Sequence, residues 1–205
     1  MARRFNPRDH YFRKAQKEGL RARSAFKLEE VAQKHRLFRP GLRVLDLGAA
    51  PGGFLQVIAA AVGKKGRAVG VDLQEIADLG LEQVSTLVAS VEDEDLSERL
   101  LEQTEGRPFD LICSDMAPAT TGSKGTDVAR SHRLVERTLE LLPELLRPRG
   151  HLVIKVFMGP GFEELRDELR NHFEKVSVER PKAIRSQSKE CYLVGLELKT
   201  GEQPG

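Results

Sequence analysis

The feature that most constrains this chain is a repeated alternation between short apolar segments and segments with helical periodicity. Seven segments have the apolar character of strands, namely 43–47, 67–72, 84–89, 109–115, 151–157, 175–179 and 192–198. Helices are expected at 53–62, 95–103, 127–146, 162–173 and between an N-cap at Ser24 and a stop near Phe38. Strands that alternate with helices form parallel sheets covered on both faces. The sequence therefore predicts an α/β fold with helices on both faces of a mostly parallel seven-stranded sheet. Since no helix separates the last two strands, one antiparallel strand is expected near an edge.

Charge is distributed unevenly along the chain, although the formal net charge is only +2. Residues 1–43 hold 13 basic and 4 acidic side chains, whereas residues 44–115 hold 5 and 14. A basic block of this kind is typical of a surface that binds a polyanion. We therefore expect residues 1–40 to form a basic, polyanion-binding extension with one helix, packed on a core domain of residues 41–199. Residues 200–205 are expected to form a disordered tail.

Apolar segments and cysteines limit the class of protein further. The longest apolar stretch, 54–62, is far shorter than the ~20 residues that span a bilayer, and the charged N-terminus lacks the apolar core of a signal peptide. Both cysteines lie in apolar runs and are expected to be reduced thiols in the core. We expect a cytoplasmic protein without a membrane segment, or the mature matrix form of an organellar protein.

The strongest local signal is the glycine-rich turn Asp46-Leu-Gly-Ala-Ala-Pro-Gly-Gly-Phe54, which follows the first strand and opens a helix. Small residues such as Gly48 and Gly52 let a ligand approach the backbone, and the helix N-terminus supplies free N–H donors. Asp72 ends the second strand, 20 residues after Gly52, where a carboxylate can accept hydrogen bonds from both hydroxyls of an adenosine ribose. The turn and Asp72 together favour a nucleotide-like cofactor over a merely tight connection.

The glycine spacing argues against a dinucleotide cofactor. The fingerprint G-x-G-x-x-G is absent, because the glycines fall at positions 48, 52 and 53. Asp46 at the strand end is unfavourable beside a pyrophosphate, but it suits a ligand with a cationic amino group and a sulfonium. S-adenosylmethionine therefore fits better than NAD, and an NAD-linked oxidoreductase is the weaker alternative.

Two charged residues lie at positions that indicate chemistry. Asp115 ends the fourth strand, and Lys155 lies inside an apolar run of the fifth. Glu190 precedes the last strand, and Lys27 lies on the basic helix. A buried ammonium loses several kcal/mol of hydration unless it is paired or functional, so Lys155 is a site candidate. A structural ion pair between Lys155 and Asp115 is the alternative, and on their own Glu190 and Lys27 would be ordinary surface residues.

Five collinear motifs extend this pattern over almost the whole chain. They are RARSAFKL at 21–28, DLGAAPGG at 46–53, SDMAP at 114–118, VIKVF at 153–157 and SQSKE at 186–190. In this combination the chain resembles the FtsJ-like family of ribose 2′-O-methyltransferases, and most closely the bacterial branch that methylates a uridine of 23S ribosomal RNA. The resemblance implies a Rossmann-like, S-adenosylmethionine-dependent methyltransferase fold.

The resemblance also assigns roles to residues. It implies a catalytic tetrad, with the lysine of the fifth strand as proton acceptor, formed by Lys27, Asp115, Lys155 and Glu190. It implies cofactor contacts at Gly52, Phe54, Asp72 and Asp115. Two positions depart from the family pattern. Phe54 replaces a common Trp, and Ser90 stands where an Asp normally faces the adenine, whose amino group a serine hydroxyl can still bind.

The expected chemistry is an in-line displacement, for which the protein must orient a ribose 2′-hydroxyl and remove its proton. We expect Lys155 to be the base, Lys27 to be a cation that stabilises the alkoxide, and the two carboxylates to orient them. No aromatic residue follows Asp115 within 115–118, which favours ribose over base methylation. The five histidines lack paired ligand spacing, so no metal is expected.

The expected partner is 23S ribosomal RNA, within the large ribosomal subunit, bound by a monomer of this protein. Phosphate contacts are expected from basic side chains at both ends of the chain, namely Arg3, Arg4, Arg8, Arg13, Lys14, Lys17, Arg21, Arg23, Arg180, Lys182, Arg185 and Lys189. Two alternatives remain open: a tRNA ribose 2′-O-methyltransferase, and a non-catalytic RNA-binding factor in ribosome assembly.

Overall fold

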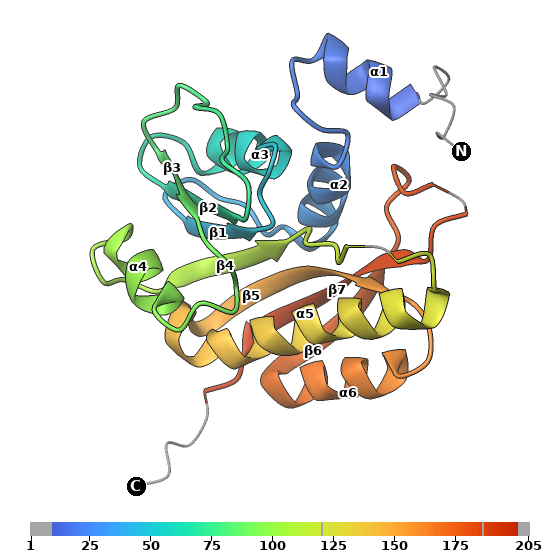
Figure 1. Ribbon diagram of the computed structural model, residues 1–205. Helices are drawn as coiled ribbons and strands as arrows, with labels where there is room; N and C mark the ends of the chain where they lie inside the picture. The colour runs from blue at the N-terminus through green and yellow to red at the C-terminus, as the bar shows by residue number, and fades with distance from the viewer. Residues whose placement is uncertain (1–9, 120, 186, 201–205) are drawn as a thin grey trace, which may run out of the picture.

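Seven strands form one sheet in the order β3-β2-β1-β4-β5-β7-β6 (Figure 1). The computed structural model describes residues 10–119, 121–185 and 187–200. Its strands are β1 (Arg43–Leu47), β2 (Arg67–Asp72), β3 (Val84–Val88), β4 (Phe109–Ser114), β5 (Leu146–Phe157), β6 (Phe173–Glu179) and β7 (Glu190–Leu198). Strand β7 runs antiparallel to both of its neighbours, β5 and β6, whereas the pairs among β1 to β5 are parallel. The predicted sheet, mostly parallel with one antiparallel strand near an edge, is confirmed.

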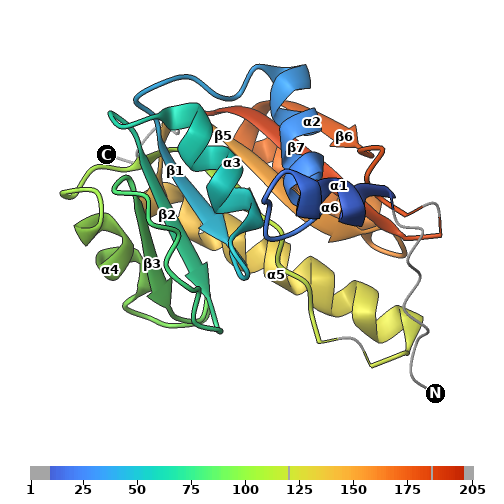
Figure 2. The same ribbon diagram turned by 90° about the horizontal axis from the view of Figure 1, so that it is seen from above.

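Helices cover both faces of this sheet, as Figures 1 and 2 show. They are α1 (His10–Lys17), α2 (Ala25–His35), α3 (Gly53–Val62), α4 (Leu96–Glu102), α5 (Lys124–Leu145) and α6 (Phe162–His172). On one face α2 and α3 bury Leu28 and Ile58 against the sheet. On the other face α4, α5 and α6 bury side chains such as Leu139 and Leu165. The result is the predicted three-layer α/β architecture, with a separate apolar core on each side of the sheet.

Helix α1 lies outermost and was not predicted from the sequence. It has 8 residues, of which Ala15 is buried. The Tyr11 ring lies 5.8 Å from the ring of Phe26 on α2, and Lys14 Nζ lies 4.3 Å above the centre of that ring. Since an isolated helix of this length is marginal in water, these contacts with α2 stabilise it.

Some predicted boundaries differ from the observed ones. Ser24 is the N-cap residue of α2, but in the described structure its side chain makes no capping hydrogen bond. Helix α2 ends at His35, three residues before the predicted stop near Phe38, because Arg36 adopts a left-handed conformation with φ 53°. Strand β5 begins at Leu146 instead of residue 151, directly after α5. Residues 201–205 of the predicted tail lie outside the described ranges.

The two cysteines lie in the core of the protein, as expected. Cys113 and Cys191 are both free and buried, which confirms that they are thiols of the core. Burial raises the pKa of Cys191 to about 12. In the part of the chain that the structure describes, no helix is both long enough and apolar enough to cross a bilayer.

Candidate active site

The glycine-rich turn joins β1 to α3 at the carboxyl edge of the sheet. Gly48 and Gly52 have positive φ values, 78° and 106°, which a residue with a Cβ rarely adopts. A Cβ on Gly48 would lie 2.8 Å from Met116 Cα, so the segment after β4 packs directly against the turn. Gly52 caps α3, whose first N–H groups have no partner within the helix. The predicted turn is therefore present, and its free backbone donors lie at the carboxyl edge of the sheet. We call this edge the crevice, because open α/β sheets bind their ligands there.

Asp72 ends β2 beside this turn. Its Oδ2 accepts a hydrogen bond from Ala50 N at 3.0 Å, and its Oδ1 accepts one from Gln74 N at 2.9 Å. These bonds fix the carboxylate while each oxygen keeps a lone pair for a further donor. The next residue, Leu73, is 73% exposed and offers an apolar surface beside the carboxylate. Asp72 is thus held where a ligand with hydroxyl groups can be bound.

Asp46 is the least satisfied group of the site. It is fully buried, and neither of its carboxylate oxygens has a hydrogen-bond partner among the described residues. Burial raises the pKa of Asp46 well above its usual range, and the nearby charges of Asp115 and Asp72 raise it further. A buried polar group without a partner is costly. The three carboxyl groups that converge at this point, those of Asp46, Asp72 and Asp115, fit a ligand that carries positive charge.

Two other predicted cofactor residues have different surroundings. The Phe54 side chain is 3% exposed and belongs to the core cluster that also contains residues of α2, and its backbone lies in the first turn of α3. Ser90 follows β3, where its N donates to Asp93 Oδ2 at 3.0 Å and its Oγ accepts from Glu92 N at 3.1 Å. A carboxylate therefore lies next to Ser90. Sequence reasoning missed Asp93, because the position of this side chain depends on the length of the loop that follows β3.

The four residues of the predicted tetrad form two ion pairs. Lys155 Nζ lies 3.0 Å from Asp115 Oδ1 and donates to the Asp115 carbonyl oxygen at 2.5 Å. Lys27 Nζ pairs with Glu190 Oε1 at 2.5 Å. Both lysines are buried, with exposures of 8% for Lys155 and 6% for Lys27. The predicted alternative, an ion pair between Lys155 and Asp115, is thus present, and it lies at the same crevice as the glycine-rich turn.

The sheet register explains why these residues meet. Asp115 follows β4, and Lys155 lies near the end of β5, so both lie at the carboxyl edge of the parallel strands. Because β7 is antiparallel, its first residue, Glu190, pairs with Phe157 at the end of β5. Lys27 reaches the same edge from α2, which covers this face of the sheet.

Tyr192 is a member of the site that sequence reasoning missed. It lies directly opposite Lys155 in the β5–β7 register, and its O–H donates to Asp115 Oδ1 at 2.6 Å. Burial raises the pKa of Tyr192 well above its usual range, and the charge of Asp115 raises it further, so the phenol remains a donor. In the sequence Tyr192 is one more apolar residue of a strand, and only the register brings it to Asp115.

The two groups of basic residues predicted to contact RNA lie on neighbouring segments. Ala15 of α1 and Ala183 of the connection between β6 and β7 belong to one small cluster around Phe26. This cluster brings α1 beside the described residues of the connection, 180–185 and 187–189 (Figure 1). Arg3, Arg4 and Arg8 lie outside the described ranges. The basic side chains of both segments can therefore contribute to one surface.

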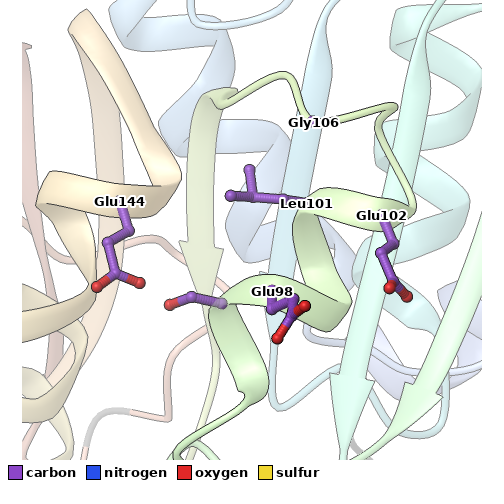
Figure 3. Close-up of a pocket in the computed structure, with 6 residues that line it drawn as sticks. Glu98, Leu101, Glu102, Gly106 and Glu144 are labelled. Carbon is purple, nitrogen blue, oxygen red and sulfur yellow. The ribbon is translucent and has the colours of Figure 1, made fainter.

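A hollow elsewhere on the surface contains none of these residues. Figure 3 shows it beside α4 and the end of α5, lined by Ser97, Glu98, Leu101, Glu102, Gly106 and Glu144. Among the described residues, no group of three or more His, Cys, Asp or Glu side chains is arranged to hold a metal ion.

Comparison with known proteins defines the class. Residues 20–198 match the model of the FtsJ-like methyltransferase family. The chain belongs to this family and is a methyltransferase.

Individual relatives agree with this assignment. The chain is 50% identical over 204 residues to "Ribosomal RNA large subunit methyltransferase E" of Myxococcus xanthus, covering 100% of this chain and 95% of that protein. It is 46% identical over 195 residues to the protein of the same name from Bdellovibrio bacteriovorus, covering 95% and 99%. Its fold is similar to a crystal structure described as a ribosomal RNA methyltransferase from Plasmodium falciparum, with a TM-score of 0.78 and 23% identity over 88% of this chain and 100% of that one.

Proposed function

We propose that this methyltransferase transfers the methyl group of S-adenosylmethionine to the 2′-hydroxyl of a uridine in 23S ribosomal RNA, acting in the cytoplasm as a monomer on the large ribosomal subunit. The observation that carries the proposal is the buried pair of Lys155 and Asp115 beside the glycine-rich turn. The name of the relatives supports the choice of large-subunit RNA as substrate.

The cofactor would be held by the β1–β2 side of the crevice. The turn at Gly48 and Gly52 would receive it closely, Asp72 would accept from its ribose hydroxyls, and Asp46 would face its positive charge. Ser90, or the neighbouring Asp93, would bind the adenine amino group. When bound, S-adenosylmethionine supplies an electrophilic methyl group.

The acceptor would be activated by Lys155. Lys155 lies 3.0 Å from Asp115, and as a general base it would accept the proton of the 2′-hydroxyl on its amine nitrogen. Asp115 is held in place by Tyr192 and orients the amine. Lys27, paired with Glu190, would remain a cation that stabilises the negative charge developing on the 2′-oxygen.

RNA would be bound by the basic extension of residues 1–40 together with residues 180–189. Neutralising phosphates releases counterions, so affinity should fall steeply as salt is raised. A protein that methylates ribose in single-stranded or looped RNA also needs to recognise the 2′-hydroxyl itself.

The function is tested with ribosomal RNA from cells that lack the protein. Purified enzyme and labelled S-adenosylmethionine should methylate large-subunit RNA from these cells, and RNA from parent cells should accept no label. Mapping of 2′-O-methyl groups locates the target. A matching RNA with a 2′-deoxy nucleotide at the target should accept no label, and methylation of that RNA would exclude ribose as the acceptor. Methylation of tRNA in place of ribosomal RNA would exclude the proposed substrate.

A further inference from the structure

Arg21 lies between α1 and α2, and its side chain is turned toward the cofactor side of the crevice. Its Nη1 donates to the carbonyl oxygens of Pro51 at 3.3 Å and Ala77 at 2.5 Å, and its Nη2 donates to that of Asp78 at 2.7 Å. One guanidinium thus joins three backbone carbonyls from two separate segments. A phosphate-binding arginine would instead keep this fork free for the ligand.

Both segments bound by Arg21 adjoin residues that are proposed to bind the cofactor. Pro51 lies in the glycine-rich turn, next to Gly52. Ala77 and Asp78 lie in the connection that follows Asp72 at the end of β2. Since no strand or helix spans residues 73–80, backbone bonds of a sheet or helix do not hold this connection in place. The Arg21 fork therefore provides a direct link between the two segments.

The position of Arg21 is itself fixed by α3. Arg21 N donates to Gln56 Oε1 at 2.8 Å, and Gln56 Nε2 donates back to Gly19 O at 3.0 Å. The following residue, Ala22, lies so close to the turn that a Cβ on Gly53 would lie 2.8 Å from the Ala22 Cβ. The segment that carries Arg21 is thus fastened to α3 and to the turn, so the guanidinium has a defined place from which to hold residues 73–80.

We propose that Arg21 is a positioning residue for the cofactor site, which holds residues 73–80 against the glycine-rich turn and so sets the shape of the crevice that receives the adenosine. The inference rests on the proposed function, because it takes S-adenosylmethionine as the cofactor. Arg21 acts through the backbone of Pro51, Ala77 and Asp78. We assign this positioning role to the planar guanidinium, because a lysine amine cannot reproduce its fixed geometry.

The experiment compares Arg21→Ala and Arg21→Lys with Lys17→Ala. Lys17 is an exposed basic residue at the end of α1, so its removal changes the same basic extension by the same charge. Two quantities are measured without RNA: the Kd for S-adenosylhomocysteine by calorimetry, and hydrogen exchange of residues 73–80 in the ligand-free protein. Steady-state kinetics then give KM for S-adenosylmethionine and kcat.

We expect Arg21→Ala to raise the Kd for S-adenosylhomocysteine about tenfold, as removal of a group that orients a binding residue commonly does. Exchange of residues 73–80 should become faster, and KM for the cofactor should rise while kcat at saturating cofactor stays near that of the wild type. Arg21→Lys should give an intermediate Kd. Lys17→Ala should bind S-adenosylhomocysteine as the wild type does.

Three results would overturn the inference. Arg21→Ala that binds S-adenosylhomocysteine normally but RNA weakly makes Arg21 an RNA contact. A lowered Tm with an unchanged Kd makes its role one of general stability. If Arg21→Ala fails to fold, Arg21→Lys is the test. A wild-type Kd for Arg21→Lys would show that the planar guanidinium is not needed. Failure of the wild-type protein to bind S-adenosylhomocysteine is a different outcome, because it contradicts the proposed function itself.

Discussion

The two sides of the crevice differ in whether their buried ionisable side chains have partners. On the β1–β2 side Asp46 is fully buried, and its carboxylate has no hydrogen-bond partner in the described structure. On the β5–β7 side the buried Lys155 and Lys27 each have a carboxylate within ion-pair distance. Under the proposed function, a ligand that brings positive charge would complete the first side, whereas the ion pairs of the second side are formed without a ligand.

This difference separates binding from catalysis. A group that lacks a partner contributes affinity when the ligand supplies one, because the cost of its burial is then removed. Paired groups that are already oriented contribute little to affinity, but they need no rearrangement during the reaction. Substitutions on the β1–β2 side should therefore change ligand binding, and substitutions on the β5–β7 side should change the rate of the chemical step.

The largest expected effect is on the paired side. Lys155→Ala removes the proposed base and should lower kcat by about 10²–10⁴-fold, with little change in the Kd for S-adenosylhomocysteine. Lys175→Ala, an exposed lysine on β6, is the control and should behave as the wild type. Retention of wild-type turnover by Lys155→Ala would exclude Lys155 as the base.

The next effect is on the β1–β2 side, where Asp46→Asn should weaken binding of S-adenosylmethionine about tenfold or more, since a hydrogen bond to a charged group contributes about 1.5–3 kcal/mol. The stability of the ligand-free protein should change in the opposite direction. The pKa of Asp46 is raised by burial, so the folded state loses stability as pH increases from the usual carboxyl range to that raised value. Asparagine avoids this loss, and its advantage should grow with pH, to about 1 kcal/mol or 2–4 °C in Tm.

A matched control for Asp46 is Asp110, a buried carboxylate at the other end of the sheet. Asp110 accepts from Arg43 N at 2.8 Å and from Arg147 Nε at 2.6 Å. Asp110→Asn should therefore lower Tm and leave cofactor binding unchanged. Calorimetry and thermal unfolding across a pH series measure both variants. If Asp46→Asn also lowers Tm at every pH, the Asp46 carboxylate makes a stabilising interaction in the folded protein. The contrast between an unpaired β1–β2 side and a paired β5–β7 side would then be wrong.

The smallest effect concerns the attachment of α2, which carries Lys27. Glu179 on β6 accepts from Lys34 Nζ at 2.7 Å and contacts His35 Nε2 at 2.8 Å. Burial raises the pKa of Glu179, but the hydrogen bonds from Lys34 and His35 outweigh this effect and leave the pKa below its usual value. Such a carboxylate contributes stability above its usual pKa, about 4.3, and this contribution is lost as pH falls through the lowered value.

Glu179→Gln should therefore lower Tm by about 2–4 °C at neutral pH, and the difference from the wild type should vanish in acid. Thermal unfolding between pH 3 and pH 8 measures it, with the exposed Glu174→Gln on the same strand as the control. A difference that persists unchanged at pH 3 would show that Glu179 acts by packing and not by charge.

The sequence contains enough information for the sheet and for part of the site. Parallel strands end at one edge, so a carboxylate after β4 and a lysine near the end of β5 are expected to meet there, as Asp115 and Lys155 do. The glycines at 48 and 52 were predictable for a different reason. A backbone with positive φ limits the residues that fit at these positions. Lys27 and Glu190 were predicted only through the family resemblance, since neither lies in a local pattern that marks a site.

Residues whose role depends on distant contacts were missed. Tyr192 is 77 residues from Asp115, Glu179 is 144 residues from His35, and Arg21 is 56 residues from Ala77. In the sequence Tyr192 has the pattern of a core residue, and Arg21 has that of one more charge in a basic segment. Sheet register and loop packing determine these contacts, and periodicity along the chain carries no information about either.

The direction of β7 has a practical consequence for handling the protein. The chain enters β7 at Glu190, beside the crevice, and leaves it at Leu198, which pairs with the first residue of β6 at the opposite edge of the sheet. An affinity tag, dye or surface tether fused after Leu198 is therefore attached away from the residues proposed to bind the cofactor and RNA. Sensor experiments on immobilised protein should use this attachment, because a fusion ahead of α1 would precede the helix that contributes to the surface proposed to bind RNA.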